Sequence, residues 1–518
     1  MNGILTITRS GSGLSPYKFT VRGMTASTRY KLEKTFESTD IRERDIRALK
    51  AWCREHKVQF KGVPLSYNRI PKRRPQVEIK TNQELYDSLY DYQRKGVNAI
   101  LSKFGGRALL GDEMGLGKTR QALACMSHYY NLGTDLRILV VCPSYLQPHW
   151  REGIREHVAD DVEIWKKKDC PSERIIVMSY NKLHNRNIEG ISWHFIVADE
   201  SHYLKNRKSQ RTTAFFPIAH KSRALLLMTG TPALNRPSEL YAQMYAIRPQ
   251  HVRSYYNFAI RFCNGKQTRY GFDDKGSSNS EELRWLLQTD YMIRRLKSDE
   301  LDLPPKTRHH ITIDVPVSKL RPIMKAKNEL SALGYTKTDM FKRQALISKC
   351  FQLTGEAKAS SCASWVKDAA TSGESFIVFA HHKVVLDSIQ SELETENITF
   401  MRIDGSVNVE ERARRAKLFQ EGKAQVAVLS ILAAGTGLTL TRASTVVFAE
   451  LYWVPGIILQ AEDRAHRVGQ TNKVSILYLI GRDTIDSRVY PQITQKLKVL
   501  DNALDGRTDR TMEPISII

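Results

Sequence analysis

The stretch GDEMGLGKT, residues 111–119, decides the fold of this 518-residue chain. The apolar run RALL at 107–110 predicts a short buried strand before it, and the pattern at 120–130 predicts a helix after it. A strand, a glycine-rich turn ending in Gly-Lys-Thr and a helix form a phosphate cradle, because backbone N–H groups and the positive helix end attract an anion. The strict pattern G-x-x-x-x-G-K-[ST] has glycine where this chain has Asp112, so a chance glycine turn is the alternative.

The cradle predicts a role in nucleotide binding for each of its residues. Lys118 is expected to reach the β- and γ-phosphates, and Thr119 is expected to hold Mg²⁺. The predicted binding residues of the loop are Gly111, Asp112, Glu113, Met114, Gly115, Leu116, Gly117, Lys118 and Thr119.

On both sides of this loop the chain alternates short apolar runs with helical patterns. Strands are predicted at 108–110, 138–141, 175–178, 195–198 and 225–228, and again at 376–379, 400–403, 426–429, 446–448 and 476–479. Helices are predicted in the second set near 383–393, 409–420, 456–466 and 485–500. Such alternation predicts an α/β fold with two parallel sheets, each covered on both faces and binding ligands at the carboxyl ends of its strands.

The composition shifts along the chain predict five segments. They are a basic N-terminal accessory region at 1–80, an ATP-binding lobe at 85–250, a partly helical insertion or connector at 251–370, a second lobe at 371–500 and a tail at 501–518. Within the connector, 265–280 is predicted to be a loop and 319–352 a helix. The stretch 41–80 has twelve Lys and Arg against four acids, which indicates either contact with nucleic acid or a solvated charged face.

The overall charge indicates a polyanionic partner. The chain has 79 Lys and Arg against 55 Asp and Glu, a net charge of +24, so nucleic acid is the expected partner and a merely basic soluble protein is the alternative. The seven cysteines are scattered without a C-x-x-C pair, which argues against disulfides and against zinc. Because no signal peptide and no membrane-spanning apolar run is found, we expect a soluble intracellular protein without a membrane partner.

Three further groups carry chemistry at strand ends or in a helix. Asp199 and Glu200 close the run FIVA; opposite a phosphate cradle, Asp199 is expected to bind Mg²⁺ through water and Glu200 to polarise the attacking water. The run MTGTP at 228–232 fits a capped turn as well as a relay between nucleotide and the second lobe. Arg464 and Arg467 are expected on one helix face, where they either bind an anion or belong to a solvated basic helix.

Together the motifs resemble the Swi/Snf-type ATPases of helicase superfamily 2, over roughly residues 85–495. The matching motifs are DYQRKGV (91–97), DEMGLGKT (112–119), VVCPSYLQPHW (140–150), ADESHYLKN (198–206), MTGTPALNRPSELY (228–241), MIRRLK (292–297), RIDGSV (402–407), VAVLSILAAGTGL (426–438) and QAEDRAHRVGQ (460–470). Within that family the motifs look most like the HepA-related annealing helicases that remodel replication forks. The resemblance implies two RecA-like lobes, ATP as the nucleotide, and an aspartate at the position of Asp112.

The resemblance also assigns roles to single residues. It implies that Gln93 reads adenine and that Arg464 and Arg467 are arginine fingers. It implies coupling between nucleotide and lobes for Ser201, His202, Thr229, Thr231 and Gln460, and contact with the DNA backbone for Ser144, Lys205, Asn206, Ser430 and Thr436. The run SILAAGTGLTL at 430–440 lacks a threonine and an asparagine that the family often has, which leaves fewer polar groups for DNA.

The expected function is ATP-driven translocation along double-stranded or forked DNA, with remodelling or reannealing of DNA in replication, recombination or repair. The alternatives are a strand-separating DNA or RNA helicase and a nucleotide-gated DNA clamp with little turnover. The sequence shows no zinc finger, nuclease motif or histone-reading module, and none of its motifs indicates a protein partner.

Overall fold

The computed structural model describes residues 4–9, 17–22, 40–41, 51–56, 59–61, 77–166, 169–186, 188–269, 271–334, 337–436, 438–505 and 513–514. The chain divides into two compact units. One contains residues 1–74 and 281–290, and the other contains residues 75–280 and 291–518.

The smaller unit contains a four-stranded sheet in the order β3-β2-β1-β4. Its strands are β1 (Ile4–Arg9), β2 (Tyr17–Arg22), β3 (Asp40–Ile41) and β4 (Gln59–Lys61). β1 pairs antiparallel with β2 and parallel with β4. Most of the Lys and Arg residues of 41–80 lie outside the described residues, so their predicted contact with nucleic acid stays a prediction.

The larger unit contains two parallel sheets, and the first of them holds the glycine-rich loop. Its strand order is β13-β5-β10-β9-β6-β8-β7, with every pair parallel. The strands are β5 (Arg107–Leu110), β6 (Ile138–Cys142), β7 (Val162–Ile164), β8 (Ile175–Ser179), β9 (Phe195–Asp199), β10 (Ala224–Met228) and β13 (Met292–Ile293). The five predicted strands of the first set are confirmed, and β7 and β13 are additions. We call this sheet and its helices the first lobe.

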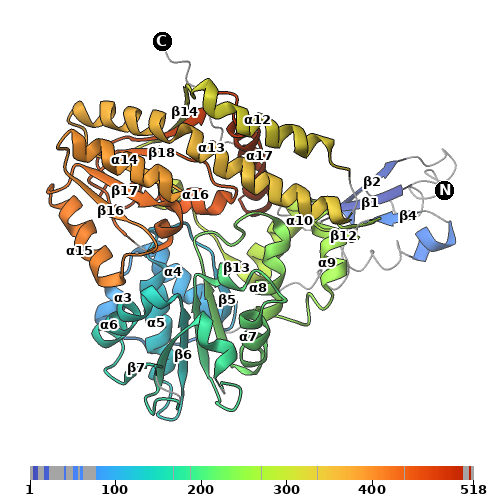
Figure 1. Cartoon of the computed structure of the whole chain (residues 1–518). Coiled ribbons are helices and arrows are strands. Elements are labelled where there is room, and N and C mark those ends of the chain that lie inside the picture. Colours follow the sequence, from blue (N-terminus) through green and yellow to red (C-terminus); the bar gives the residue numbers. More distant parts are fainter. Residues whose placement is uncertain are drawn as a thin grey trace. The chain divides into compact units, whose positions relative to one another are not determined.

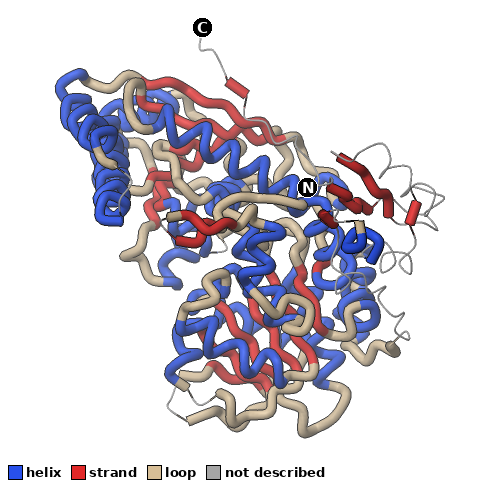
Figure 2. Tube along the Cα trace, turned by 90° about the vertical axis from the view of Figure 1, so that its right-hand side faces the viewer, coloured by secondary structure: helices blue, strands red, loops and turns tan. Residues whose placement is uncertain are grey.

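Helices cover both faces of this sheet, as Figures 1 and 2 show. They are α3 (Gln83–Asp87), α4 (Asp91–Asn98), α5 (Lys118–Tyr130), α6 (Gln147–His157), α7 (Gln210–Lys221) and α8 (Leu240–Ile247). In Figure 1, α5 and α6 lie on the opposite side of the strands from α7 and α8. β6, β8, β9 and β10 are buried along their whole length, as a parallel sheet between two helical layers requires.

The second lobe is built in the same way around the order β16-β17-β15-β18-β19-β14-β20, again all parallel. Its strands are β14 (Lys306–Ile313), β15 (Phe376–Ala380), β16 (Phe400–Ile403), β17 (Val426–Ser430), β18 (Thr445–Phe448), β19 (Val474–Gly481) and β20 (Glu513–Pro514). The five predicted strands of the second set are confirmed. Alternate residues of β15 enter two different apolar clusters, Ile377 and Phe379 one and Phe376 and Val378 the other, so both faces of the sheet are buried. Together the two lobes confirm the predicted fold class.

The second lobe carries its own helices. They are α12 (Val317–Ala332), α13 (Lys337–Thr371), α14 (Lys383–Thr395), α15 (Val409–Gln420), α16 (Pro455–Glu462) and α17 (Asp486–Leu504). Two predictions on helices need correction. The helix expected over 319–352 is two helices, and the helix expected over 456–466 ends at Glu462, so Arg464 and Arg467 lie in the turn that follows it.

The segment 251–370, which was predicted to be a partly helical insertion or connector, contains strands as well as helices. It contributes β13 to the first sheet and β14 to the second. The loop expected at 265–280 contains a short hairpin, in which β11 (Lys266–Thr268) pairs antiparallel with β12 (Gly271–Asp273). In the described part of the chain, no helix is long and apolar enough to cross a membrane.

Candidate nucleotide-binding site

The glycine-rich loop leaves the carboxyl end of β5 and enters α5. Gly115 and Gly117 have φ values of +88° and +68°, a backbone region that side chains with a Cβ rarely adopt. Gly117 is the N-cap of α5, so the loop closes directly at the helix N-terminus. The loop thus has the backbone turn and the helix dipole that the phosphate cradle predicts.

Lys118 lies inside the loop that precedes it. Its Nζ donates to the carbonyl oxygens of Asp112 at 2.8 Å and Glu113 at 3.0 Å. Burial lowers the pKa of Lys118, and the charges of Glu200, Asp112 and Asp199 oppose this effect. The amine is therefore held by carbonyl oxygens at the strand ends, within electrostatic range of the two acids that close β9.

Asp199 and Glu200 end the neighbouring strand β9. Asp199 accepts hydrogen bonds from Trp150 Nε1 and from the backbone N–H of Glu200, both at 2.9 Å. Burial and the charge of Glu200 raise the pKa of Asp199 to about 6. Burial alone would raise the pKa of Glu200 too, but the hydrogen bond and charge of His202, with Lys118 and Arg464, lower it. The two acids therefore differ in their ionisation although they are adjacent.

The predicted coupling residues form hydrogen bonds around Glu200. His202 Nδ1 lies 3.2 Å from Glu200 Oε2 and 3.2 Å from Thr229 Oγ1, and the N–H of Thr231 donates to Thr229 Oγ1 at 3.1 Å. From α16 of the second lobe, Gln460 Nε2 donates to Thr231 Oγ1 at 3.2 Å. The hydroxyl of Thr229 thus lies among the polar groups around Glu200. Thr229 caps no helix, because the next helical segment begins at Pro237. Ser201, which follows Glu200 in the chain, donates a hydrogen bond from its Oγ to Gln243 Oε1 at 2.8 Å.

The two predicted finger arginines approach this site from the second lobe. Arg464 is buried, and its charge influences both Glu200 and Tyr145 of the first lobe. The Cβ of Arg467 lies 3.6 Å from where a Cβ on Gly115 would lie, beside the loop. Within the described residues, the buried Nε of Arg464 has no hydrogen-bond partner, which suits a site that receives an anion.

Asp112 has a structural partner that the sequence did not predict. Its carboxylate accepts from Arg295 Nε at 3.0 Å and Nη2 at 2.5 Å, and from Gln121 Nε2 at 3.1 Å. Arg295 belongs to the motif MIRRLK, which resemblance matched without a role. The carboxylate of Asp112 is therefore directed to this ion pair, and only its backbone carbonyl contacts Lys118.

Gln93 also supports the loop in this structure. It is 3% exposed; its Nε2 donates to the carbonyl of Leu116 at 3.2 Å, and its Oε1 accepts from the N–H of Tyr90 at 3.0 Å. A Cβ on Gly117 would overlap the Gln93 amide, so the two residues are in direct contact. The predicted reading of adenine by Gln93 stays a prediction.

The predicted DNA-contacting residues lie on several loops. Lys205 and Asn206 line a cavity of about 550 Å³ together with Arg207, Lys208 and Arg236. Ser144 is exposed at the start of the short helix Ser144–Leu146, and Ser430 ends β17 of the second lobe; neither lines that cavity. The side chain of Thr436 lies outside the described residues.

The segment 294–297 contributes residues that sequence reasoning missed. Arg294 Nη1 donates to the carbonyl oxygens of Gly111 at 2.7 Å and Gly230 at 3.1 Å, and its Nε and Nη2 contact the Asp505 carboxylate at 2.9 and 3.1 Å. The backbone N–H of Lys297 donates to Glu113 Oε2 at 2.7 Å. The available signal is the pair Arg294-Arg295 directly after an apolar pair, with Lys297 one residue further on, and nothing in the sequence indicates which acids they contact.

Comparison with known proteins places these features in a family. A family model described as SNF2-related domain matches residues 92–321, and one described as helicase conserved C-terminal domain matches residues 358–469. A solved structure, the Sulfolobus solfataricus SWI2/SNF2 ATPase core in complex with dsDNA, is 21% identical and covers 84% of this chain and 96% of its own, at a TM-score of 0.41 that is too low to carry an argument.

Three relatives illustrate the sequence similarity. The SWI/SNF-related matrix-associated actin-dependent regulator of chromatin subfamily A-like protein 1 of Xenopus tropicalis is 39% identical over 83% of this chain and 46% of its own length. The DNA annealing helicase and endonuclease ZRANB3 of Homo sapiens is 35% identical over 86% of this chain and 44% of its own. The chain spans about half the length of the first curated relatives it matches.

The third relative is the Caenorhabditis elegans homologue of the subfamily A-like protein 1. It is 35% identical over 485 residues, which are 89% of this chain and 69% of that protein. The predicted resemblance to Swi/Snf-type ATPases is thereby confirmed, and the chain belongs to the SNF2-related family of helicase-like ATPases.

Proposed function

We propose that this chain is a DNA-dependent ATPase that translocates along double-stranded or forked DNA and remodels or reanneals it. The observation that carries the proposal is the approach of Arg464 and Arg467 from the second lobe to Glu200 and the glycine-rich loop of the first. A site divided between two lobes couples nucleotide chemistry to their relative movement. Relatives named DNA annealing helicases support the choice of DNA.

The residues present fit ATP with Mg²⁺. The loop N–H groups and Lys118 suit phosphate oxygens, and Thr119 with Asp199 offers oxygen ligands of the kind that Mg²⁺ prefers. When bound, the metal neutralises charge on the phosphates. His202, with Lys118 and Arg464, lowers the pKa of Glu200, which keeps its carboxylate ionised and able to orient and polarise a water molecule. Arg464 and Arg467 supply positive charge where negative charge develops on the transferred phosphoryl group.

The proposed coupling between nucleotide and the second lobe uses the hydrogen bonds around Glu200. Hydrogen bonds link Glu200 to His202, His202 to Thr229, and Thr229 to Thr231. Thr231 in turn accepts a hydrogen bond from Gln460 of the second lobe. A change at the phosphates therefore has a direct route to the lobe contact. Ser144, Lys205 and Asn206 on one lobe and Ser430 and Thr436 on the other are proposed to bind the DNA backbone, which is recognised without regard to sequence.

The test measures ATP turnover with forked DNA, duplex DNA, single-stranded DNA and RNA at several salt concentrations. We expect forked or duplex DNA to stimulate most, and stimulation to fall with salt because backbone contacts release counterions. Lys118→Ala should abolish the stimulated rate. RNA as the strongest activator would favour the helicase alternative, and near-zero turnover with saturating DNA would favour the clamp; either contradicts the proposal.

A further inference from the structure

Lys297 links the glycine-rich loop to the segment that carries Arg464 and Arg467. Its Nζ lies 2.9 Å from Asp463 Oδ1 and donates to the His466 carbonyl at 2.7 Å. In the chain, Asp463 directly precedes Arg464, and His466 directly precedes Arg467. The side chains of Lys297 and Asp463 are 5% and 9% exposed, so the contact is shielded from water.

The other end of Lys297 is attached to the loop. Its backbone N–H donates to Glu113 Oε2 at 2.7 Å, and the N–H of Glu113 donates to the Arg295 carbonyl at 3.0 Å. The carbonyl of the same Glu113 accepts from Lys118 Nζ at 3.0 Å. A continuous series of hydrogen bonds therefore runs from Lys118 through Glu113 and Lys297 to the arginine segment.

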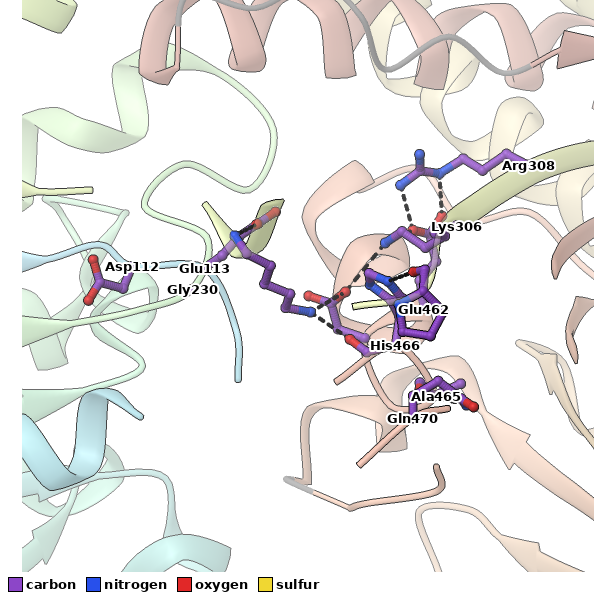
Figure 3. Close-up of polar contacts among 12 residues, drawn as sticks. Asp112, Glu113, Gly230, Lys306, Arg308, Glu462, Ala465, His466 and Gln470 are labelled. Atoms are coloured by element: carbon purple, nitrogen blue, oxygen red, sulfur yellow. Dashed lines mark hydrogen bonds and ion pairs between the residues drawn. The ribbon is translucent and has the colours of Figure 1, made fainter. Parts of the chain in front are cut away.

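A second group of ion pairs also holds this segment. Lys306 Nζ lies 2.9 Å from Glu462 and 3.4 Å from Asp463, and Arg308 lies 2.7 Å from Glu462, as Figure 3 shows for Lys306, Arg308 and Glu462. The hydroxyl of Tyr478 donates a hydrogen bond to Glu462 Oε1 at 2.7 Å. Both acids at the end of α16 thus have fixed partners on β14.

The electrostatics favour an ionised pair between Lys297 and Asp463. Burial would raise the pKa of Asp463, but the charges of Lys297 and Lys306 outweigh it and lower the pKa to about 2. Burial lowers the pKa of Lys297, and Asp463 opposes that effect. A buried ion pair adds little stability compared with apolar packing, whereas loss of one partner leaves an uncompensated charge, so such pairs fix geometry.

We propose that Lys297 is a positioning residue for ATP hydrolysis, which holds Arg464 and Arg467 against the glycine-rich loop by binding Asp463 and the His466 carbonyl. In this proposal it acts through the two arginines, although its own Cε lies 3.6 Å from where a Cβ on Gly115 would lie. This inference rests on the proposed ATPase function. It assigns the motif MIRRLK a role in assembling the two-lobe site, beyond the packing of an edge strand.

A positioning role predicts a particular kinetic pattern. Because the arginines assist the transferred phosphoryl group rather than the binding of ATP to the first lobe, their displacement should lower kcat and leave KM nearly unchanged. A misplacement of about 1 Å in a reacting group costs about 10²-fold in rate. We therefore expect Lys297→Met to lower the DNA-stimulated kcat by about 10- to 100-fold, and Lys297→Arg to recover part of the loss.

The experiment measures kcat and KM of the full chain with saturating duplex DNA for Lys297→Met, Asp463→Asn and the double variant. The control is Lys417→Met, whose side chain is 78% exposed on α15. If the pair acts as a unit, the double variant loses no more rate than the more damaged single variant. Asp463→Asn, which is nearly isosteric, carries the test if thermal unfolding shows that Lys297→Met is misfolded.

The outcomes separate this inference from the function on which it rests. No DNA-stimulated turnover in the wild-type chain contradicts the proposed function itself. An active wild type with a wild-type kcat in Lys297→Met overturns the positioning role alone. The same holds if KM rises at constant kcat, or if the two single losses multiply in the double variant.

Discussion

Asp199 and Glu200 are adjacent acids whose pKa values are shifted in opposite directions. Burial and Glu200 raise the pKa of Asp199 to about 6, while His202 is the main cause of the lowered pKa of Glu200. Falling pH therefore protonates Asp199 first, at about pH 6. Under the proposed function, a metal ion at Asp199 would compete with that proton, and Glu200 keeps its charge in the same range.

We expect the affinity for nucleotide in the presence of Mg²⁺ to fall below pH 6. One proton competes with one metal ion, so the dissociation constant should rise about tenfold for each pH unit below the pKa of Asp199. Binding of a fluorescent ATP analogue between pH 5 and 8, with Mg²⁺ and with EDTA, measures this. Equal affinity at pH 5.5 and 7.5, or a pH dependence that EDTA does not remove, would count against the assignment of Asp199.

Single residues also show which parts of the site are predictable from the sequence. The predicted roles of Lys118, Asp199 and Glu200 follow from the Gly-Lys-Thr pattern and from a pair of acids at a strand end, and the sheet brings those strand ends together. The coupling role of Thr229 is implied only by the family resemblance, because the residues alone fit a capped turn equally well. The partner of Asp112 was not predictable, because Arg295 lies 183 positions away and meets it only through the pairing of β13 with β5. Spacing within a motif does not specify an ion pair between motifs.

At the level of elements, the end of α16 is determined by charge as well as by helix propensity. Glu462 is fully buried at the last helical position and receives Lys306 and Arg308 from β14. The helix expected over 456–466 ends there, and the N–H groups of Arg464 and Ala465 donate to the carbonyl oxygens of Ala461 and Glu462, three residues earlier, which closes two four-residue turns. Those partners come from outside the local sequence, which is why helical periodicity overestimated the helix.

Glu462→Gln should destabilise the second lobe by about 3–5 kcal/mol at neutral pH, because it removes the carboxylate that pairs with the buried Arg308 and leaves Lys306 with Asp463 alone. Burial opposes but does not cancel the lowering of the pKa of Glu462 by Arg308 and Lys306. A lowered pKa contributes stability above the unfolded-state pKa of about 4.3, which is lost as pH falls through the folded-state value. Urea denaturation at pH 7 measures the difference.

The matched control for this prediction is Glu421→Gln. Glu421 also pairs with two lysines, Lys417 and Lys423, but on the exposed surface, where such pairs add little. We expect no measurable change in that variant. Equal stability of Glu462→Gln and the wild-type chain would show that the buried ion pairs do not fix the end of α16.

Three of the strands that sequence analysis missed show two physical reasons for the failure. β7 and β13 have three and two residues, too few for a periodic pattern. β14 reads KTRHHITI, a polar run that becomes a strand because it pairs along its whole length with β19 and places Lys306 and Arg308 against Glu462. Long-range pairing overrides local composition in such segments.

On the scale of the whole two-lobe unit, the contacts between the lobes converge near the nucleotide loop. Gln460 meets Thr231, Lys297 meets Asp463, and Arg294 meets Asp505 at the end of α17. Arg294 also holds the carbonyl oxygens of Gly111 and Gly230, so the loop and the second lobe share one guanidinium. The α/β class of both lobes was predictable from alternation, whereas these contacts depend on how the lobes close.

The central claim is that hydrolysis needs residues from both lobes, and a comparison of two variants tests it most directly. ATP binding and DNA-stimulated turnover are measured for the wild-type chain, Lys118→Ala and Arg464→Ala with saturating duplex DNA. We predict that Lys118→Ala loses both, and that Arg464→Ala binds ATP like the wild type while its turnover falls by about 10³-fold or more. Wild-type turnover in Arg464→Ala would contradict the two-lobe site.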